Sequence, residues 1–460
     1  MALAVSLDLL ARHDKAGPRY TSYPTAPVWS ERFGPADYLD EIRRTNTRQP
    51  PAPLSLYLHI PFCNTLCYFC GCSMMVTKDE AKMRGYVDCL CQEIDRIADL
   101  LAPGRPVHQL QWGGGTPNYL TDELIERLVR TVTRRFTFAG DAEIGLEVDP
   151  RDTRPGQITW LRGLGFNRLS LGVQDFDPKV QQAVNRLQTE ALTRRVIEEA
   201  RSACYHSLNI DLIYGLPYQT AESFGRTLDI LIDIGPDRLA VFNYAHVPSI
   251  KRHQRLIPSA ALPPPAEKLR MLKLTIERLT GAGYVYIGMD HFARPDDKLC
   301  VAQRARSLHR NFQGYTTKAG CDLYAFGATA ISMVGDCYAQ NLKDLTAYEE
   351  TVRAGGVPTL RGYRLNMDDR IRRHVIMRLL CDLELDKRDV ESRFGLEFDD
   401  YFATELHHLV RYAEEGLIDL QADRVVVTEA GRLLARNLAM EFDAYLRDES
   451  ADQPLFSRTI

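Results

Sequence analysis

The stretch that decides the fold reads Leu54-Ser55-Leu56-Tyr57-Leu58-His59-Ile60-Pro61-Phe62-Cys63-Asn64-Thr65-Leu66-Cys67-Tyr68-Phe69-Cys70-Gly71-Cys72. It opens on an apolar run rich in strand formers and closes on four cysteines. The thiols therefore lie where a strand ends and a loop begins. That is the position at which α/β proteins place their chemistry.

The three cysteines Cys63, Cys67 and Cys70 can face one another only across something small that binds sulfur, either zinc or an iron–sulfur cluster. Structural zinc needs four ligands, usually as two separated pairs, and no second pair follows downstream. A [4Fe–4S] cluster held by three thiolates leaves one iron open for catalysis. The spacing, with aromatic Phe69 before the third cysteine, resembles the signature of the radical S-adenosylmethionine (SAM) superfamily.

Short β-branched runs alternate with helical patterns along the first half of the chain. A helix is predicted where apolar residues recur at steps of three and four from Met83 to Leu101. Parallel pairing with right-handed crossovers would join the units into an open (βα)6 barrel, a partial TIM-type barrel of α/β class. The predicted strands are 54–62, 107–113, 142–148, 168–174, 208–214 and 238–244, and the other helices are 121–136, 155–164, 190–204 and 220–233.

Four regions are expected: an N-terminal arm over 1–50, the radical SAM barrel core over 51–250, a barrel extension that closes the mouth over 251–365, and a C-terminal domain over 366–460. The last region is predicted to be mainly helical, with a β-hairpin around 417–428 and a final helix. Helices with a hairpin are typical of a winged helix. No basic recognition helix is visible, which favours a substrate-covering or folding role over DNA binding.

Composition favours a soluble cytoplasmic enzyme. The chain has 460 residues, a net charge of −4 and no basic block, which argues against nucleic acid as the main partner. No apolar run reaches the roughly 20 residues of a membrane span, and no export signal is seen near the N-terminus. Eleven cysteines, most without regular spacing, indicate a reducing compartment. Cys89 and Cys91 are expected to be packing residues.

Residues at the carboxyl ends of the predicted strands are candidates for ligand binding. The glycines at 113–115 either let backbone approach a ligand closely or form a tight turn. Glu147 could hold ribose hydroxyls or an ammonium group, or be a solvated acid at a strand end. Gln174 ends the fourth strand. Asp211, flanked by aliphatic residues, should be substantially buried, and buried acids are paired or functional.

Several long motifs resemble the family of oxygen-independent coproporphyrinogen III oxidases, also called coproporphyrinogen dehydrogenases, and the similarity covers almost the full length. Besides the cysteine and glycine loops, the matching stretches are 19–25 (RYTSYPT), 147–151 (EVDPR), 172–176 (GVQDF), 209–217 (NIDLIYGLP), 242–246 (FNYAH), 288–293 (GMDHFA) and 309–315 (HRNFQGY).

The resemblance implies a reaction and a set of sites. A 5′-deoxyadenosyl radical from SAM would drive oxidative decarboxylation of two propionates of coproporphyrinogen III to vinyl groups, giving protoporphyrinogen IX in porphyrin and haem biosynthesis. Cys63, Cys67 and Cys70 would hold the [4Fe–4S] cluster. Contacts to the first SAM would come from Tyr57, Gly114, Glu147 and Ile331, and contacts to a second SAM from Phe69, Gly115, Thr116, Gln174, Arg186, Asp211 and Ala245.

Other expectations are less tied to single motifs. Cys72 is a catalytic residue by the resemblance, or else a buried spare thiol. The four substrate carboxylates call for cations, and the candidates are Arg19, His59, His246, His291, Arg294, His309, Arg310 and Arg458. The N-terminal arm and the tail 456–458 could fold over the barrel opening. A low-potential donor such as flavodoxin or ferredoxin and a monomeric state are expected.

Two alternative functions stay open. The first is a haem-binding or haem-delivering relative that keeps the three cysteines. Such relatives typically lack an equivalent of Cys72 and the 19–25 arm, both of which this chain has. The second is a radical SAM methyltransferase or haem-degrading enzyme that uses the second SAM as methyl donor.

Overall fold

One twelve-stranded sheet organises the molecule, and the computed structural model describes it within residues 6–446 and Arg458. The strand order is β16-β15-β14-β13-β1-β4-β5-β6-β7-β8-β10-β9. The strands of this sheet are β1 (Leu54–Ile60), β4 (Val107–Gly114), β5 (Phe138–Val148), β6 (Arg168–Gln174), β7 (Ser207–Tyr214), β8 (Arg238–Asn243), β9 (Val285–Gly288), β10 (His291–Ala293), β13 (Asp322–Phe326), β14 (Ile331–Val334), β15 (Cys337–Asn341) and β16 (Thr359–Arg364).

The predicted barrel core is confirmed. β1, β4, β5, β6, β7 and β8 are parallel neighbours in that order. The sequence missed the strands outside this core. β13 adds a seventh parallel strand beside β1, and antiparallel strands extend both edges, β14 to β16 on one side and β10 with β9 on the other.

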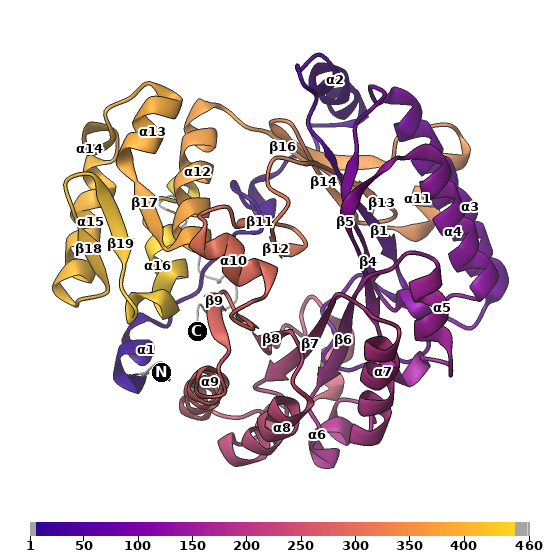
Figure 1. The fold of residues 1–460 in the computed structure, drawn as a ribbon, viewed down its shortest axis with the longest axis horizontal. Helices are drawn as coiled ribbons and strands as arrows, with labels where there is room; N and C mark the ends of the chain where they lie inside the picture. Colours follow the sequence, from indigo (N-terminus) through magenta and orange to yellow (C-terminus); the bar gives the residue numbers. More distant parts are fainter. Residues whose placement is uncertain (1–5, 447–457, 459–460) are drawn as a thin grey trace.

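Helices between the parallel strands cover the outer side of the curved sheet, as Figure 1 shows. The predicted amphipathic helix is α3, Glu80–Leu100, whose Cys89 and Cys91 are buried packing residues as expected. The other helices of the layer are α4 (Asp122–Arg135), α5 (Gln157–Gly163), α6 (Pro178–Ala183), α7 (Glu190–Ser202), α8 (Ala221–Ile234) and α9 (Pro265–Gly281).

Alternation along each strand sorts side chains between the two faces of the sheet. In β1, Leu54, Leu56 and Leu58 are almost wholly buried and belong to the main core. Ser55 has the opposite orientation, because successive side chains point to opposite faces, and its hydroxyl donates to Gln109 Oε1 of β4 at 3.2 Å. The aliphatic face therefore packs against helices while polar side chains line the barrel interior.

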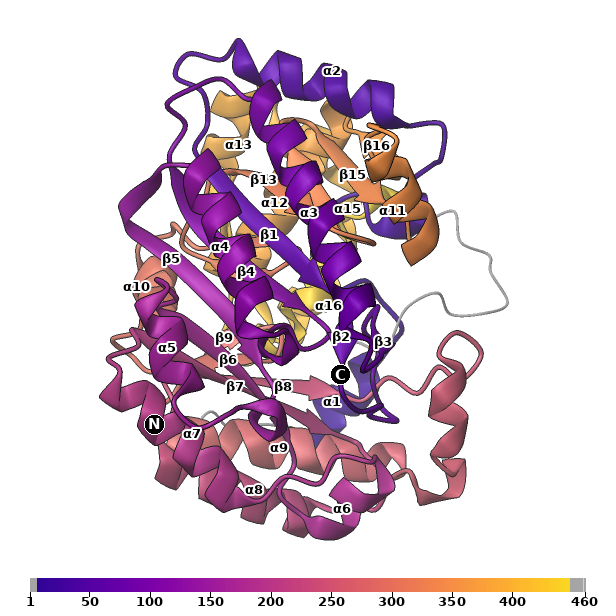
Figure 2. The ribbon, with the colours of Figure 1, turned by 90° about the vertical axis from the view of Figure 1, so that its right-hand side faces the viewer.

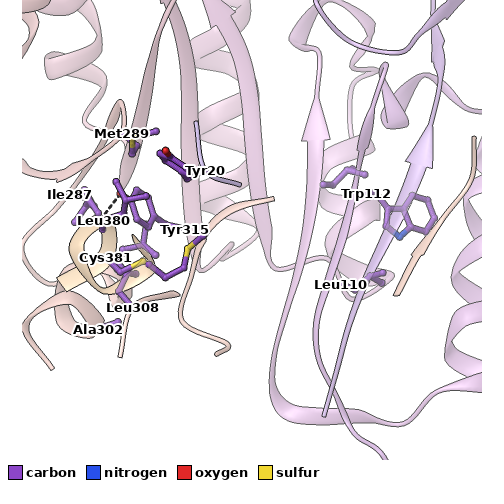
Figure 3. Packing of buried hydrophobic residues seen from close by; sticks show 14 of the residues in the cluster. Tyr20, Leu110, Trp112, Ile287, Met289, Ala302, Leu308, Tyr315, Leu380 and Cys381 are labelled. Carbon is purple, nitrogen blue, oxygen red and sulfur yellow. Dashed lines mark hydrogen bonds between the residues drawn. The ribbon is translucent and has the colours of Figure 1, made fainter. Parts of the chain in front are cut away.

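The C-terminal region is mainly helical and contains the predicted hairpin. Its strands are β17 (Glu384–Asp386), β18 (Ile418–Leu420) and β19 (Arg424–Val427), and its helices are α12 (Met367–Asp382), α13 (Lys387–Phe394), α14 (Phe398–Tyr401), α15 (Ala403–Glu414) and α16 (Ala435–Met440). Figure 3 shows how it meets the barrel extension: the Tyr315 hydroxyl donates to the Leu380 carbonyl at 2.9 Å, among Ile287 and Cys381.

The remaining elements belong to the N-terminal arm, the cysteine loop and the connections between the later strands. The arm pairs with the far end of the chain at Ala16 and Arg458; residues 456 and 457 lie outside the described part. The elements are α1 (Leu7–His13), α2 (Pro35–Asn46), α10 (Lys298–Arg304), α11 (Leu345–Arg353), β2 (Phe62–Cys63), β3 (Met75–Val76), β11 (His309–Asn311) and β12 (Gly314–Thr316). No helix of the described chain is long and apolar enough to span a membrane.

Candidate active site

The cysteine loop follows β1 and is held beside the carboxyl ends of the strands (Figure 2). Two short strands, β2 and β3, pair in parallel across it. Asn185 Nδ2 donates to the Leu66 carbonyl at 2.8 Å, and Asn64 Nδ2 donates to Asp152 Oδ1 at 2.9 Å. The loop is therefore fixed from two directions by residues far away in the sequence.

Each of the three motif cysteines has a donor aimed at its sulfur. Thr116 Oγ1 donates to Cys63 Sγ at 3.3 Å, and Arg151 Nη2 donates to Cys67 Sγ at 3.3 Å. The Cys72 backbone N–H lies 3.4 Å from Cys70 Sγ. Donors of this kind favour the thiolate form, which is the form that binds metals.

Burial opposes that preference at Cys63. It raises the pKa of the Cys63 thiol to about 12, despite the hydrogen bond from Thr116. A hydrogen bond from the Cys72 side chain lowers the pKa of Cys70 and raises that of Cys72. Three thiolates in this setting need a positively charged centre to offset their desolvation.

The donor set fits an iron–sulfur cluster better than a single ion. Among the described residues, no group of three or more His, Cys, Asp or Glu side chains converges on one point that a metal ion could occupy. The ligands of a [4Fe–4S] cluster bind different iron atoms, so their sulfurs need not converge. Guanidinium donors from Arg151 and Arg186, which reach Cys67 Sγ at 3.3 and 3.6 Å, suit the sulfur ligands of a cluster.

The glycine loop leaves backbone uncovered where side chains would collide. Gly114 has φ +116°, and a Cβ there would lie 2.6 Å from the His59 ring. A Cβ on Gly115 would lie 2.8 Å from the backbone of Pro61 and Phe62. Close approach of the His59 ring of β1 to Gly114, and of the Pro61 and Phe62 backbone to Gly115, accounts for glycine at both positions.

Two carboxyls face the barrel interior. Glu147 Oε2 accepts from the Gly114 backbone N–H at 3.1 Å, and burial, followed by the charge of Asp211, raises its pKa to about 7. Asp211 accepts from Ser170 Oγ at 3.1 Å and Asn209 Nδ2 at 2.8 Å, and burial raises its pKa to about 6. Asp211 is partly buried, and its side chain lines a cavity rather than the core.

That cavity occupies the barrel interior and has a volume of about 220 Å³. Its lining follows the polar alternation of the strands and is closed on the far side by the β11–β12 hairpin. A larger cavity of about 1030 Å³ lies between β13–β15 and the C-terminal domain, away from the cysteine loop. The smaller cavity is lined by Gln109, Gln111, Glu143, Glu147, Arg168, Ser170, Asn209, Asp211, Phe242, His291, Gln313 and Tyr315 among others.

Gln174 and Arg186 lie together beside the cysteine loop. Gln174 has a φ of +71° and a buried Oε1 without a hydrogen-bond partner in the described chain. Arg186 is buried, pairs with Asp149 Oδ2 at 2.9 Å and reaches Cys67 Sγ. The unfilled amide oxygen marks Gln174 as a site with hydrogen-bonding capacity left for a ligand.

The other residues predicted to contact SAM are Phe69, Ala245, Tyr57 and Ile331. The Gln254 side chain donates to the carbonyls of both Phe69 and Ala245, at 3.0 and 3.3 Å, and so brings them together. The Tyr57 hydroxyl lies 3.3 Å from His59 Nδ1, and burial, with the charge of Glu147, raises its pKa. Ile331 opens β14 and packs in the apolar cluster around Trp29 and Tyr338.

Cys72 is exposed, so the alternative of a buried spare thiol is wrong. The sequence also missed the groups that hold the loop from outside. Lys251 Nζ donates to the Cys72 carbonyl at 2.8 Å, and His253 Nε2 donates to the Cys70 carbonyl at 2.7 Å. The signal that could have revealed them is a basic run, Lys251 to Arg255, in a stretch without acids.

The candidate cations have different surroundings. Arg294 donates to the carbonyls of Gly235 and Pro236 at the end of α8, and Arg458 pairs with Asp14, so both have structural partners. His59 Nε2 donates to the Ser73 carbonyl at 2.9 Å. Toward the cavities lie Arg19, His291, His309 and Arg310, and near the mouth His246 lies 3.0 Å from the Tyr244 hydroxyl.

Comparisons with known proteins follow the same division into barrel and C-terminal domain. Residues 57–231 match the family model of the radical SAM superfamily, and residues 365–434 match that of the HemN C-terminal domain. The oxygen-independent coproporphyrinogen III oxidase of Escherichia coli is 51% identical over 454 residues, covering 99% of this chain and 98% of that protein. The one from Synechocystis is 47% identical, with the same coverage of both chains.

A solved structure extends this likeness to the whole fold. Coproporphyrinogen III oxidase (HemN) from Escherichia coli, described as a radical SAM enzyme, superposes with a TM-score of 0.92 at 50% identity, covering 97% of this chain and 100% of that one. The fold, the three-cysteine loop and the full-length identity therefore agree, and the chain belongs to the oxygen-independent coproporphyrinogen III oxidase family of the radical SAM superfamily.

Proposed function

We propose that this protein converts two propionate side chains of coproporphyrinogen III to vinyl groups without oxygen, giving protoporphyrinogen IX. The observation that carries the proposal is identity of about half the residues, over nearly the whole of both chains, with relatives named for this activity. Full-length agreement favours it over haem delivery and over methyl transfer. We also propose that the protein works as a monomer in a reducing cytoplasm.

The family implies a [4Fe–4S] cluster and SAM, which together supply, when bound, a carbon-centred radical that removes a hydrogen atom from the propionate. Cys63, Cys67 and Cys70 would hold the cluster. Each propionate would then release carbon dioxide and pass one further electron to an acceptor. Separately, a low-potential donor such as flavodoxin or ferredoxin would supply one electron to the enzyme. We propose one SAM for each propionate.

The chain's own groups would position SAM. We propose that Tyr57, Gly114 and Ile331 contact a first SAM. The Glu147 carboxylate, which accepts from the Gly114 N–H, would also accept from the hydroxyl or ammonium groups of that SAM. For a second SAM we propose the unfilled Gln174 amide, Asp211 and Arg186, with Phe69, Gly115, Thr116 and Ala245 around them.

The substrate's carboxylates need buried positive charge, and Arg310 offers it. The residue is 4% exposed, its guanidinium lies 4.9 Å from the Tyr315 ring centroid, and its Nε and Nη1 have no hydrogen-bond partner within the described residues. Tyr315 and His291 line the barrel cavity and touch each other edge to face. A buried unpaired guanidinium is costly, and a bidentate carboxylate is its natural partner.

Other arginines gather around the same place. The Arg19 guanidinium is paired with Asp290 and lies 5.3 Å from the ring centroid of Phe242, a residue of the cavity wall. Burial, followed by the charges of Arg436 and Arg310, lowers its pKa to about 10. The buried Arg432 Nε also has no partner in the described chain. An anion placed among these groups would relieve their mutual repulsion, so we propose that they bind the propionates that do not react.

Cys72 remains the proposed catalytic side chain. It is exposed, and its backbone N–H lies 3.4 Å from the sulfur of the proposed ligand Cys70. Replacing the thiol by a hydroxyl would keep that backbone contact. Cys72→Ser should therefore retain the cluster and lose turnover; if its turnover equals that of the parent, Cys72 has no catalytic part.

Anaerobic turnover of the iron–sulfur-reconstituted protein tests the function. The assay supplies SAM, a reductant and coproporphyrinogen III, and it follows 5′-deoxyadenosine and, after oxidation, protoporphyrin IX. About two deoxyadenosines per protoporphyrin are expected, one for each radical step. Deoxyadenosine without protoporphyrin would keep the radical chemistry and remove the substrate, and the haem-delivering or methyltransferase reading would then lead.

A further inference from the structure

The segment that leaves β8 crosses the outside of the cysteine loop and presents two different sides. On the inner side, Lys251, His253 and Gln254 donate to the carbonyls of Cys72, Cys70 and Phe69, at 2.8, 2.7 and 3.0 Å. In Figure 2 this part of the chain projects from the end of β8 on the same side as β2 and β3. These three side chains tie the segment directly to the cysteine loop.

The outer side carries charge and apolar surface together. Arg252 and Arg255 are exposed, and neither has an ion pair or side-chain hydrogen bond to another described residue. Beside them, Ile250 is 75% exposed and Leu256 56% exposed. Two free guanidiniums next to two exposed aliphatic side chains are typical of a binding surface, because monomers seldom expose such groups together without a partner.

The covering segment and the cysteine loop both lie in stretches of sequence without acidic residues. No Asp or Glu occurs between Asp237 and Glu267 or between Glu41 and Asp79, although the chain has 61 acidic residues in 460. The first gap contains the covering segment and the second contains the cysteine loop. The covering segment itself therefore carries only basic charges within a protein whose net charge is −4, and these would attract a negatively charged partner.

We propose that Ile250, Arg252, Arg255 and Leu256 form the docking surface for a small acidic protein that carries single low-potential electrons. The inference rests on the proposed function, since radical chemistry at the three cysteines requires one electron from outside. In this step the carrier is oxidised by one electron and the cluster is reduced by one, and no atoms are transferred.

The position of the surface suits that transfer. A carrier seated on this segment would lie next to His253, which contacts the Cys70 carbonyl directly. Electron-transfer encounters are small and short-lived, and charges at their rim set the association rate and its dependence on salt. Two arginines flanked by two aliphatic side chains match such an encounter.

The test compares two reductants on the same protein. Arg252 and Arg255 are both changed to Glu in the full-length, cluster-loaded enzyme, and protoporphyrin formation is measured with limiting acidic flavodoxin, kept reduced by its reductase, or with dithionite. We expect the flavodoxin-driven rate to fall about tenfold or more, with its salt dependence flattened, because the rim attraction becomes repulsion. The dithionite-driven rate should stay unchanged.

A matched control is provided by Arg130 on α4 and Arg388 on α13, which are exposed and have no ion pair among the described residues. The double change of these two to Glu alters net charge equally and should leave both rates as in the parent. Arg252→Gln with Arg255→Gln serves if charge reversal prevents folding, and it should show a smaller loss in the same direction.

Two results would overturn the inference: an unchanged flavodoxin-driven rate, or an equal fall of both rates, which would mean that the segment only supports the cysteine loop. Replacing flavodoxin by an acidic ferredoxin should reproduce the loss, because the surface responds to acidic charge rather than to one cofactor. Failure of the proposed function is a separate outcome, since the parent would then make no protoporphyrin even with dithionite.

Discussion

Glu93, on the buried face of α3, and Glu147, near the carboxyl end of β5, are both carboxyls whose pKa burial raises to about 7. Glu93 accepts from the Tyr348 hydroxyl, the Gly327 N–H and the Asn341 amide at 2.6, 2.8 and 2.7 Å. Glu147 accepts one bond, from Gly114 at 3.1 Å, and opens on the cavity. A raised pKa thus marks both acids, and only the unfilled hydrogen-bonding capacity of Glu147 separates this proposed ligand site from the structural Glu93.

The largest expected effect separates a cysteine of the loop, Cys63, from a packing cysteine of α3, Cys91. Cys63→Ala should remove the cluster and reduce turnover by about 10³-fold or more, because the radical chemistry belongs to the cofactor. Cys91→Ser on α3 should leave both intact, since Cys91 only packs and accepts from Thr131 Oγ1. Iron and sulfide content and anaerobic turnover measure the difference.

Cys72→Ser sharpens the same measurement, because its iron content should equal that of the parent. Loss of iron from Cys91→Ser, or full iron retention with activity in Cys63→Ala, would contradict the assignment of Cys63 as a cluster ligand and Cys91 as a packing residue.

The glutamates come next. Glu147→Gln should fold normally, since its amide oxygen can still accept from Gly114, and should lose about 10- to 100-fold in turnover for one charge-assisted hydrogen bond to SAM. Glu93→Gln should keep turnover per folded molecule and lose about 2–4 kcal/mol of unfolding free energy, because its new NH₂ would face one of three donors. Urea unfolding and turnover at several SAM concentrations distinguish the two, and an exchange of these phenotypes would refute the comparison.

The strands that carry these residues could be predicted because parallel strands read as apolar runs between amphipathic helices. β13 to β16 escaped prediction because they follow a long irregular segment and their place beside β1 depends on tertiary pairing.

The proposed metal ligands are chosen by spacing and resemblance alone. The surroundings of these residues could not be predicted from the sequence. Arg151 reaches Cys67 from 84 residues away, and His253 reaches Cys70 from 183 residues away. Likewise, nothing in the local sequence tells that Arg310 lacks a partner while Arg294 caps a helix, because both facts depend on how distant segments pack.

Those two arginines give the third prediction. Arg310→Met should raise the KM for coproporphyrinogen III about tenfold, with a smaller change in kcat, because one charged hydrogen-bond partner of a non-reacting carboxylate is lost. Arg310→Lys should recover part of the affinity, since it keeps the charge without the fork geometry. Arg294→Met is the matched control: its guanidinium lies over the Tyr284 ring as that of Arg310 lies over Tyr315, and its loss should lower stability without changing KM.

The smallest effect is a pH dependence of stability in the cluster-free protein. Between pH 4.5 and about 7, Glu147 in the native state holds a proton that the unfolded state has lost, so its contribution makes stability fall as pH rises through this window. His291, whose pKa burial and Arg310 lower to about 3, acts in the opposite sense up to pH 6.5. Comparing Glu147→Gln with the parent cancels the histidine. The variant should gain about 1–2 kcal/mol relative to the parent from pH 4.5 to 7 and nothing further above it, measured by urea unfolding at each pH. A difference that does not change with pH would mean that Glu147 is solvated like an ordinary acid at a strand end, and its distinction as a ligand site would go with it.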